Sequence, residues 1–264
     1  MISISYRDAL ALQQALVRNK IDSKSQVPSP DLLVLLQHQP VYTAGRRATD
    51  NAWLEQETSR LSRANPGAEF VSTLRGGETT FHGPGQLVGY PILDIGMMGI
   101  STRRYVDQLL KVISEILTHP ALPMPIRTLN PCDDPNLPVG TFVGDVGKKI
   151  ASIGIQVRRR VTSHGFALNV ERKCEAGFQH IVPCGLSNTR LISIESALAD
   201  LAGEKTAPAP TRAVRVLDMV PATVETFGKR FGRKMCEIGD TTEQGLDPTT
   251  LRLLRDFKPA SQTG

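Results

Sequence analysis

The chain has 264 residues, of which 40% are hydrophobic and 22% are charged, as in ordinary globular proteins. No apolar run approaches the roughly 18 residues that a membrane-spanning helix needs, which argues against an integral membrane protein. Lys and Arg outnumber Asp and Glu by 31 to 26, and the formal net charge of +5 suits an acidic partner. Aromatic residues are only 5%, so binding of single-stranded nucleic acid by base stacking is not expected.

The N-terminal part of the chain predicts one helix and two strands. Ser5 is a suitable N-cap, and apolar residues from Tyr6 onward recur at spacings of three and four. Residues 20–30 are polar, contain two prolines and are expected to form an inserted loop. The apolar run at 32–36 predicts a buried strand, and residues 70–74 predict a second one.

The middle of the chain predicts a strand, a helix and a long loop. The strand is expected at 87–93, where Pro91 indicates a sheet edge or a strand end. Residues 102–118 have the apolar spacing of a helix. Residues 120–145 contain six prolines and little periodicity, so we expect a long loop or insertion.

Two alternating segments, 150–157 and 161–170, predict strands that are joined as a hairpin. The arginine run at 158–160 would form its turn, which we interpret as solvated; a docking patch for an acidic protein is the alternative. Residues 193–201 and 214–231 predict further helices. The whole pattern is that of an α+β protein with a mixed sheet flanked by helices.

The chain is expected to form a single domain over residues 1–264, with a tail that frays after about Cys236. The four cysteines have neither C-x-x-C pairing nor zinc-finger spacing with histidine, and we expect no metal and no cofactor. Few cysteines and no secretory signal predict a reduced, intracellular protein. Whether a targeting leader precedes the N-terminus stays open.

The stretch from Arg75 to Gln86 has the most informative composition in the chain. Five of its twelve residues are Gly or Pro, yet it also carries Arg75, a glutamate, two threonines and His82. Glycine lets the main chain approach a ligand closely, and proline makes the turn rigid. The sequence therefore predicts a rigid loop that cradles a substrate, rather than a simple surface turn.

Cys184 lies between Pro183 and Gly185, a setting that can present a thiol beside backbone N–H groups. Such a cysteine is a candidate nucleophile, whereas the other three cysteines are interpreted as ordinary small residues. A thiol nucleophile needs activation, and two arrangements are open. His164 would form a Cys–His pair, and Lys148 or Lys149 would form a Cys–Lys dyad.

Four motifs, in this order, resemble those of the lipoyl(octanoyl) transferases. They are the stretch from 75 to 91, Gly147-Lys-Lys-Ile-Ala-Ser-Ile-Gly154, Thr162-Ser-His-Gly-Phe-Ala-Leu-Asn169 and Ile181-Val-Pro-Cys-Gly185. The resemblance covers most of the chain, from about Tyr6 to the helix after Ser193. It implies the fold of the biotin/lipoate protein ligases and transfer of octanoyl groups from acyl carrier protein to a lysine of a lipoyl domain.

The resemblance also implies roles for individual residues. Cys184 would carry the acyl group as a thioester, and Lys149 would lower the pKa of the thiol. The residues that would line the acyl and substrate site are Arg75, Gly76, Gly77, Glu78, Thr79, Thr80, Phe81, His82, Ser152, Ile153, Gly154, His164, Gly165, Phe166 and Ala167. The expected acceptors are lipoyl domains of 2-oxoacid dehydrogenase E2 subunits and the glycine cleavage H protein.

The segments at 20–30 and 120–145 look like insertions relative to compact bacterial members and suggest a mitochondrial location, with a cytoplasmic one if the source is bacterial. An ATP-dependent lipoate or biotin protein ligase on the same fold is the first alternative function, because fold alone does not determine activity. A catalytically inactive protein that binds carrier domains is the second, and a thiol peptidase using Cys184 and His164 is the third.

Overall fold

The computed structural model describes residues 3–23, 29–47, 50–182, 189–204, 213–238 and 247–257. Within these ranges the larger sheet has eight strands, and the path through seven of them is β1-β2-β6-β10-β9-β8-β7, with β11 paired to β9. The strands are β1 (Ser3–Ile4), β2 (Leu32–His38), β6 (Gln86–Ile92), β7 (Thr128–Leu129), β8 (Thr141–Val143), β9 (Lys148–Arg158), β10 (Val161–Asn169) and β11 (Arg190–Leu191). The sheet is mixed, because β1 and β11 pair in parallel and the other neighbours pair antiparallel.

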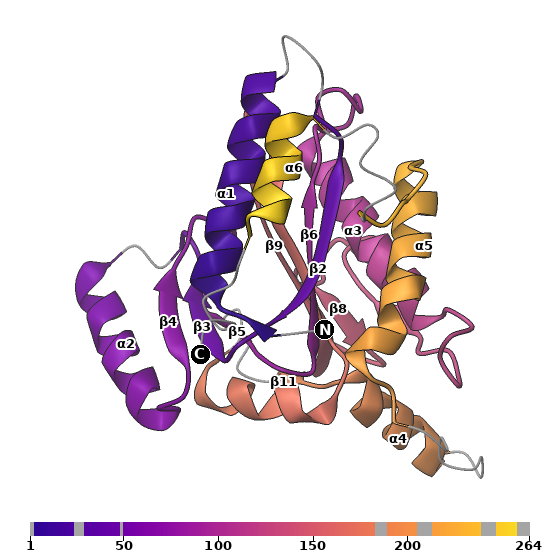
Figure 1. Cartoon of the computed structure of the whole chain (residues 1–264). Coiled ribbons are helices and arrows are strands. Elements are labelled where there is room, and N and C mark those ends of the chain that lie inside the picture. Colours follow the sequence, from indigo (N-terminus) through magenta and orange to yellow (C-terminus); the bar gives the residue numbers. More distant parts are fainter. Residues whose placement is uncertain are drawn as a thin grey trace.

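A second, three-stranded sheet lies beside the first, at the left of Figure 1. Its order is β4-β3-β5, with β3 (Val41–Ala44) between β4 (Glu69–Ser72) and β5 (Thr80–His82). Helix α2 (Asn51–Ala64) packs against it through Leu61. The Gly-rich loop runs from β4 into β5, so the small sheet carries this loop to the face of the large one.

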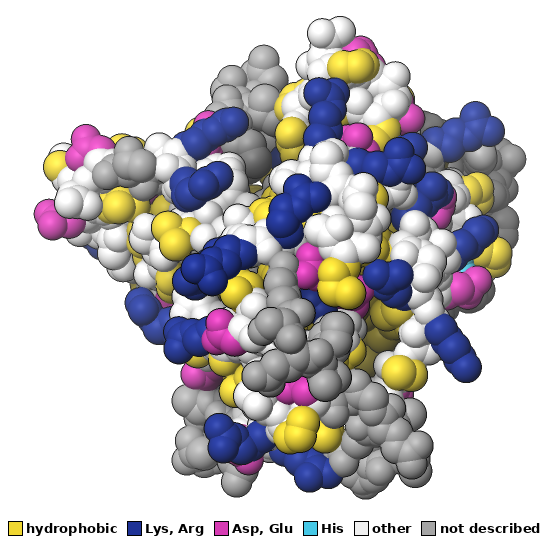
Figure 2. All heavy atoms as spheres, turned by 90° about the horizontal axis from the view of Figure 1, so that it is seen from above, with side chains coloured by type: hydrophobic (Ala, Val, Ile, Leu, Met, Phe, Trp, Pro, Cys, Tyr) yellow, Lys and Arg dark blue, Asp and Glu magenta, His cyan; other side chains and the backbone are white. Residues whose placement is uncertain are grey.

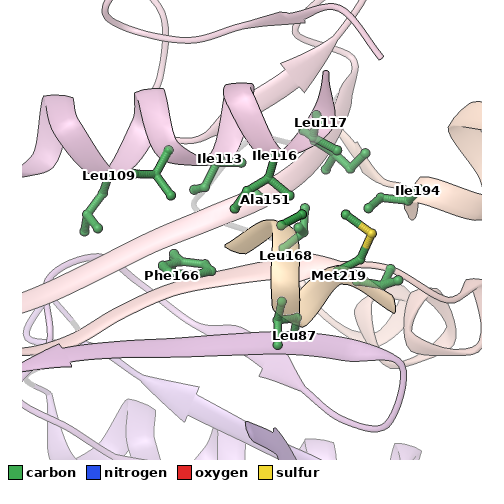
Figure 3. Close-up of a cluster of buried hydrophobic side chains, with 14 of the residues drawn as sticks. Leu87, Leu109, Ile113, Ile116, Leu117, Ala151, Phe166, Leu168, Ile194 and Met219 are labelled. Atoms are coloured by element: carbon green, nitrogen blue, oxygen red, sulfur yellow. The ribbon is translucent and has the colours of Figure 1, made fainter. Parts of the chain in front are cut away.

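Helices cover both faces of the large sheet. On one face, α3 (Thr102–Leu117) and α5 (Met219–Phe231) pack over β9 and β10, and Figure 3 shows the side chains of α3 pointing onto these strands. On the other face lie α1 (Tyr6–Asp22) and α6 (Pro248–Arg255), side by side in Figure 1. The 3₁₀-helix η2 (Arg172–His180), a second 3₁₀ turn, η4 (Val216–Asp218), and α4 (Ile194–Glu204) complete the described helices.

The strand and helix predictions from local pattern are confirmed for the main elements. Ser5 caps α1 by accepting a hydrogen bond from Asp8 N at 3.1 Å. Pro91 was expected at a sheet edge or at a strand end. It lies near the end of β6, and β6 is an internal strand between β2 and β10. Arg159 and Arg160 form the exposed turn of the β9–β10 hairpin.

Three segments differ from the expectation. Residues 120–145 are not one long loop, because β7 and β8 lie within them and extend the sheet beyond β9. Helix α2 was not predicted, because its sequence is polar and only Leu61 is buried. Part of the tail after Cys236 is helical: α6 is held on α1 by Asn19, whose side-chain amide donates to Asp247 and Thr250 at 3.0 and 2.8 Å.

The surface carries charges of both signs. Seen from above in Figure 2, Lys and Arg side chains are spread over the described part of this face, with fewer Asp and Glu side chains between them. Among the described helices, none combines the length and the apolar character that crossing a bilayer requires.

Candidate active site

A pocket with an empty volume of about 480 Å³, solvent at its mouth included, lies between the Gly-rich loop and the large sheet. Its walls come from the Gly-rich loop, the centre of β6, β9 and β10, and the start of α1. It is lined by Tyr6, Arg75, Gly77, Glu78, Thr80, His82, Val88, Tyr90, Ser152, Ile153, Gly154, His164, Gly165, Phe166 and Ala167. All the residues predicted for the substrate site belong to this lining except Gly76, Thr79 and Phe81.

Arg75 ties the Gly-rich loop to the small sheet. Its guanidinium is buried, and Nη2 donates to the carbonyl and hydroxyl oxygens of Thr43 at 2.6 and 2.8 Å and to the carbonyl of Glu78 at 2.8 Å. These acceptors are neutral, so the guanidinium keeps its positive charge in the pocket wall. A Cβ on Gly45 would lie 2.2 Å from the carbonyl oxygen of Gly77, so the loop can approach β3 this closely only because Gly45 has no side chain.

A chain of hydrogen bonds determines which nitrogen of His82 carries the proton. The Asn169 amide donates to the carbonyl of Ile192 at 3.1 Å, and the Gln86 amide donates to Asn169 Oδ1 at 2.9 Å. Gln86 Oε1 must therefore accept from His82 Nδ1, 2.7 Å away. Burial lowers the pKa of His82 well below its usual value, so the ring is neutral and its Nε2 is an acceptor.

His38 lies behind the pocket wall and is also held as a neutral ring. Its Nδ1 donates to the carbonyl of Ile4 at 3.1 Å, so its Nε2 accepts from the Tyr90 hydroxyl at 2.6 Å. Burial lowers the pKa of His38 to about 4. The Tyr90 proton is therefore directed away from the pocket.

His164 has an unusual backbone for a residue inside a strand. Its φ is +54°, and its N–H donates to the side-chain oxygen of Gln13 on α1 at 2.8 Å. The Tyr6 hydroxyl lies 3.5 Å from His164 Nδ1. Burial, and secondly the charge of Arg75, lowers the pKa of His164 to about 4, so this third histidine is neutral as well.

The apolar part of the pocket depends on close packing between β6 and β10. A Cβ on Gly89 would lie 2.4 Å from the ring of Phe166, and one on Gly165 would lie 2.2 Å from the carbonyl oxygen of Gly89. The two glycines therefore allow the Phe166 ring to lie across the neighbouring strand. With Val88 and Ile153, this ring gives the pocket an apolar wall.

Lys149 is buried at the start of β9, and its side chain is 1% exposed. Its Nζ donates to the carbonyl of Val139 at 3.1 Å and lies 5.7 Å from the centre of the Phe142 ring. Gly140, with φ +146°, leaves room for it: a Cβ there would be 2.5 Å from Lys149 Cε. Among the residues that the structure describes, Lys149 does not contribute to the pocket lining.

Cys184 lies outside the described residues, in the segment 183–188. The chain on both sides of this segment is described and well anchored. Before it, Ile181 N donates to the carbonyl of Phe178 at 3.3 Å. After it, the pairing of β11 with β9 aligns Arg190 with Lys148 and Leu191 with Lys149.

Of the three described cysteines, Cys174 and Cys132 have the burial expected of ordinary small residues, whereas Cys236 does not. Cys174 is buried, and burial raises the pKa of its thiol to about 12. Cys132 is partly buried, and burial raises the pKa of its thiol too. Cys236 is exposed near the C-terminal end. Within the described ranges, no group of three or more His, Cys, Asp and Glu residues is arranged to hold a metal ion.

Sequence reasoning missed four residues of the site. Tyr6, Val88 and Tyr90 line the pocket, and Gln13 holds His164 from behind. Tyr6 begins the periodic face of the helix that the spacing predicts, and Gln13 is buried on the same helix. The only sequence signal for a polar role was the presence of Gln13 on that face.

Comparison with known proteins gives consistent matches over most of the chain. Residues 5–215 match the lipoyl protein ligase A/B catalytic domain. An octanoyltransferase of Caldicellulosiruptor saccharolyticus is 36% identical over 88% of this chain and 86% of its own length. The mitochondrial octanoyl-[acyl-carrier-protein]:protein N-octanoyltransferase of Danio rerio is 37% identical over 86% of this chain and 88% of its own length.

Solved structures with low sequence identity share the fold. A lipoate-protein ligase A bound with ATP superimposes with a TM-score of 0.59 at 14% identity, over 98% of this chain and 92% of the other. A putative lipoate protein ligase from T. acidophilum gives a TM-score of 0.58 at 14% identity, over 93% and 88%. These likenesses confirm the predicted ligase-like mixed sheet flanked by helices.

Proposed function

The chain belongs to the lipoyl protein ligase A/B catalytic-domain family and is an octanoyltransferase, and on that premise we propose that it transfers its acyl group through a thioester on Cys184. Lys149 is the basic partner of the thiol. The observation that supports this pairing most directly is β11, because it brings the chain that follows Cys184 against the strand that begins with Lys148 and Lys149.

A second contact supports the same arrangement. Ile192 N donates to the carbonyl of Lys149 at 2.9 Å, directly after β11. The Glu175 carboxylate, on η2, accepts from the backbone and hydroxyl of Ser193 at 2.8 and 2.6 Å. The described chain before residue 183 and the chain after residue 188 are thus joined to each other and to the strand that carries Lys149.

The chemistry takes two steps. In the first, the Cys184 thiolate attacks the donor thioester carbonyl, the bond to the donor sulfur breaks, and the donor leaves as a thiol with the proton that Cys184 gave up. In the second, a neutral lysine amine attacks the acyl-enzyme and Cys184 leaves as the thiolate. The amine proton passes to Lys149 at this step. Exchange between thioesters is nearly isoenergetic, so the reaction needs no ATP.

The pocket would hold the acyl chain while this exchange takes place. Phe166, Val88 and Ile153 give it an apolar wall, and burial keeps the rings of His82 and His164 neutral beside the chain. Ser152, which lines the pocket, is three residues from Lys149 along β9, about 10 Å in an extended strand. A group bound in the pocket can therefore extend toward the Lys149 end of that strand.

The donor and the acceptors are proposed from the relatives and from charge. The relative from Danio rerio is named for octanoyl-acyl carrier protein as donor and protein as acceptor. We assign the same donor here, with lipoyl domains of 2-oxoacid dehydrogenase E2 subunits and the glycine cleavage H protein as acceptors. The net charge of +5 favours acidic carrier domains. The relatives from Arabidopsis thaliana and Danio rerio are named mitochondrial and the one from Caldicellulosiruptor saccharolyticus is not, and we propose a mitochondrial location.

The decisive test is the intact mass of the protein after mixing with octanoyl-acyl carrier protein. The wild type should gain one octanoyl group and lose it when apo lipoyl domain is added. Cys184→Ala should gain none, whereas the matched variant Cys132→Ala should behave as the wild type. An adduct that persists on Cys184→Ala, or transfer that requires ATP and free octanoate, would overturn the thioester mechanism.

A further inference from the structure

His164 is the most strained described residue in the pocket lining. A φ of +54° belongs to the left-handed region, which costs a residue with a side chain about 1–2 kcal/mol. Such strain persists only where the surroundings impose it, and it is common where a side chain must be aimed. Here the side chain is a buried ring in the wall of the pocket.

Helix α1 imposes this conformation. The His164 N–H donates to Gln13 Oε1 on α1 at 2.8 Å. Gln13 Nε2 is buried and has no hydrogen-bond partner among the described residues, so this side chain is oriented by its bond to His164. The Tyr6 hydroxyl, from the first turn of the same helix, lies 3.5 Å from His164 Nδ1. Two side chains of α1 therefore hold the backbone and the ring of His164.

The pocket has an open rim and a closed end. Glu78 and Ser152 are partly exposed at the rim, whereas Tyr6 and His164 are buried to 1% and 3% exposure. Ala167 lies opposite Ser152 on β10, and His164 lies three residues further from the Lys149 end of the sheet. The closed end is therefore the end that lies away from Lys149.

The length of this path matches one acyl chain. From Ala167 to His164 an extended strand covers about 10 Å. An octanoyl chain has seven C–C bonds of about 1.5 Å each, which in zigzag span roughly 9 Å. A chain whose carbonyl lies near the row of Ala167 and Ser152 ends at the ring of His164.

We propose that His164, held by Gln13 and Tyr6, is the end stop of the acyl pocket and limits the transferred chain to about eight carbons. The inference rests on the proposed function, because it takes the thioester carbonyl to lie at the row of Ala167 and Ser152, the end of this path that is nearer to Lys149. An end stop held through its backbone cannot swing aside as a free side chain can. Longer chains are therefore rejected more steeply than a wall of flexible aliphatic side chains would reject them.

The test is His164→Gly, which removes the ring and replaces it with the residue that adopts a positive φ most easily. Transfer is measured as kcat/KM with acyl carrier protein loaded with chains of six to fourteen carbons. The wild type should lose on the order of tenfold per added methylene beyond eight carbons. His164→Gly should transfer ten- and twelve-carbon chains about as well as eight.

Arg159→Gly is the matched control, because Arg159 also has a positive φ, of 47°, but lies in the exposed turn of the hairpin. It relieves the same kind of strain and should leave the chain-length profile of the wild type unchanged. An unchanged profile in His164→Gly would overturn the end stop, and so would a shift of equal size in Arg159→Gly.

Binding separates this inference from the transfer mechanism. The probes are acyl pantetheine analogues of the same chain lengths in which a methylene replaces the thioester sulfur, so that no acyl group can be transferred. Titration calorimetry should give Kd values that rise beyond eight carbons for the wild type and not for His164→Gly. That result supports the end stop even if Cys184→Ala retains transfer. Equal Kd values at all lengths in the wild type would overturn the end stop, whatever the mechanism.

Discussion

The closed end of the pocket and the corner around Lys149 both bury polar side chains, but the partners of these side chains differ. At the closed end, His38, Tyr90 and His164 are neutral; the rings of His38 and Tyr90 share a hydrogen bond, and the backbone of His164 is held by Gln13. At the other corner, the buried amine of Lys149 contacts the carbonyl of Val139 and the ring of Phe142, in space left by Gly140. In the roles that we propose, the closed end limits the acyl chain, whereas the Lys149 corner provides the group that exchanges a proton.

Replacing the ammonium should give the largest effect. Lys149→Met has a side chain of similar length and no proton to exchange, so transfer should fall by about 10²–10³-fold, as expected for loss of a general acid–base group. The matched control is Lys148→Met, because Lys148 is only partly buried and pairs with Asp200 at 2.9 Å. Single-turnover transfer rates of the two variants give the measurement. Equal losses in both would remove the functional distinction between the two regions.

Acid should affect the closed end through its histidines. In the folded state the pKa values of His38 and His164 are about 4, whereas the usual value for histidine is 6.5. The unfolded state therefore binds more protons than the folded state between pH 4 and pH 6.5. Stability is then complete above pH 6.5 and is lost as pH falls toward 4. Each histidine should cost about 2 kcal/mol at pH 5. Urea unfolding at pH 7 and pH 5 measures this, and His38→Gln should reduce the difference.

A side chain at position 140 should displace Lys149, because it would occupy the space that the Lys149 side chain now fills. In Gly140→Ala the new methyl group would lie 2.5 Å from Lys149 Cε, which is too close. The alanine would also have to adopt a φ of +146°, which residues with a side chain disfavour. We expect a loss of about 2–3 kcal/mol of stability and a fall in kcat that approaches that of Lys149→Met. Gly99→Ala also has a positive φ but no atom within 4 Å of the new Cβ, and it should keep full activity.

The smallest effect is expected from one hydroxyl of the closed end. Tyr90→Phe removes the proton donated to His38 Nε2 and leaves a buried acceptor without its partner. This should cost about 1–3 kcal/mol of unfolding free energy and leave the preference for eight carbons in place, because the His164 backbone is not touched. Chemical denaturation and the chain-length series measure the two outcomes. A loss of chain-length preference in this variant would show that the closed end acts as one network rather than through His164.

Local pattern was enough for the elements that bury an apolar face. The spacing in α1 and α3, the alternation in β9 and β10 and the Gly-rich loop all predicted what the structure contains. The loop could be assigned to a substrate because so many Gly, Pro and polar residues in one short stretch suit little else. The short strands β7 and β8 could not be predicted, because two- and three-residue strands form only when β9 offers an edge to pair with.

The sequence by itself determined the family, the fold class and most of the residues that line the pocket, because these depend on motifs that are contiguous in the chain. Only the tertiary structure decided that Tyr6 lines the pocket and that Gln13 supports it from behind, since both reach His164 across more than 150 residues of chain. It also decided which nitrogen of His82 is protonated, through Gln86 and Asn169. Contacts between distant segments follow from packing, and no local pattern records them.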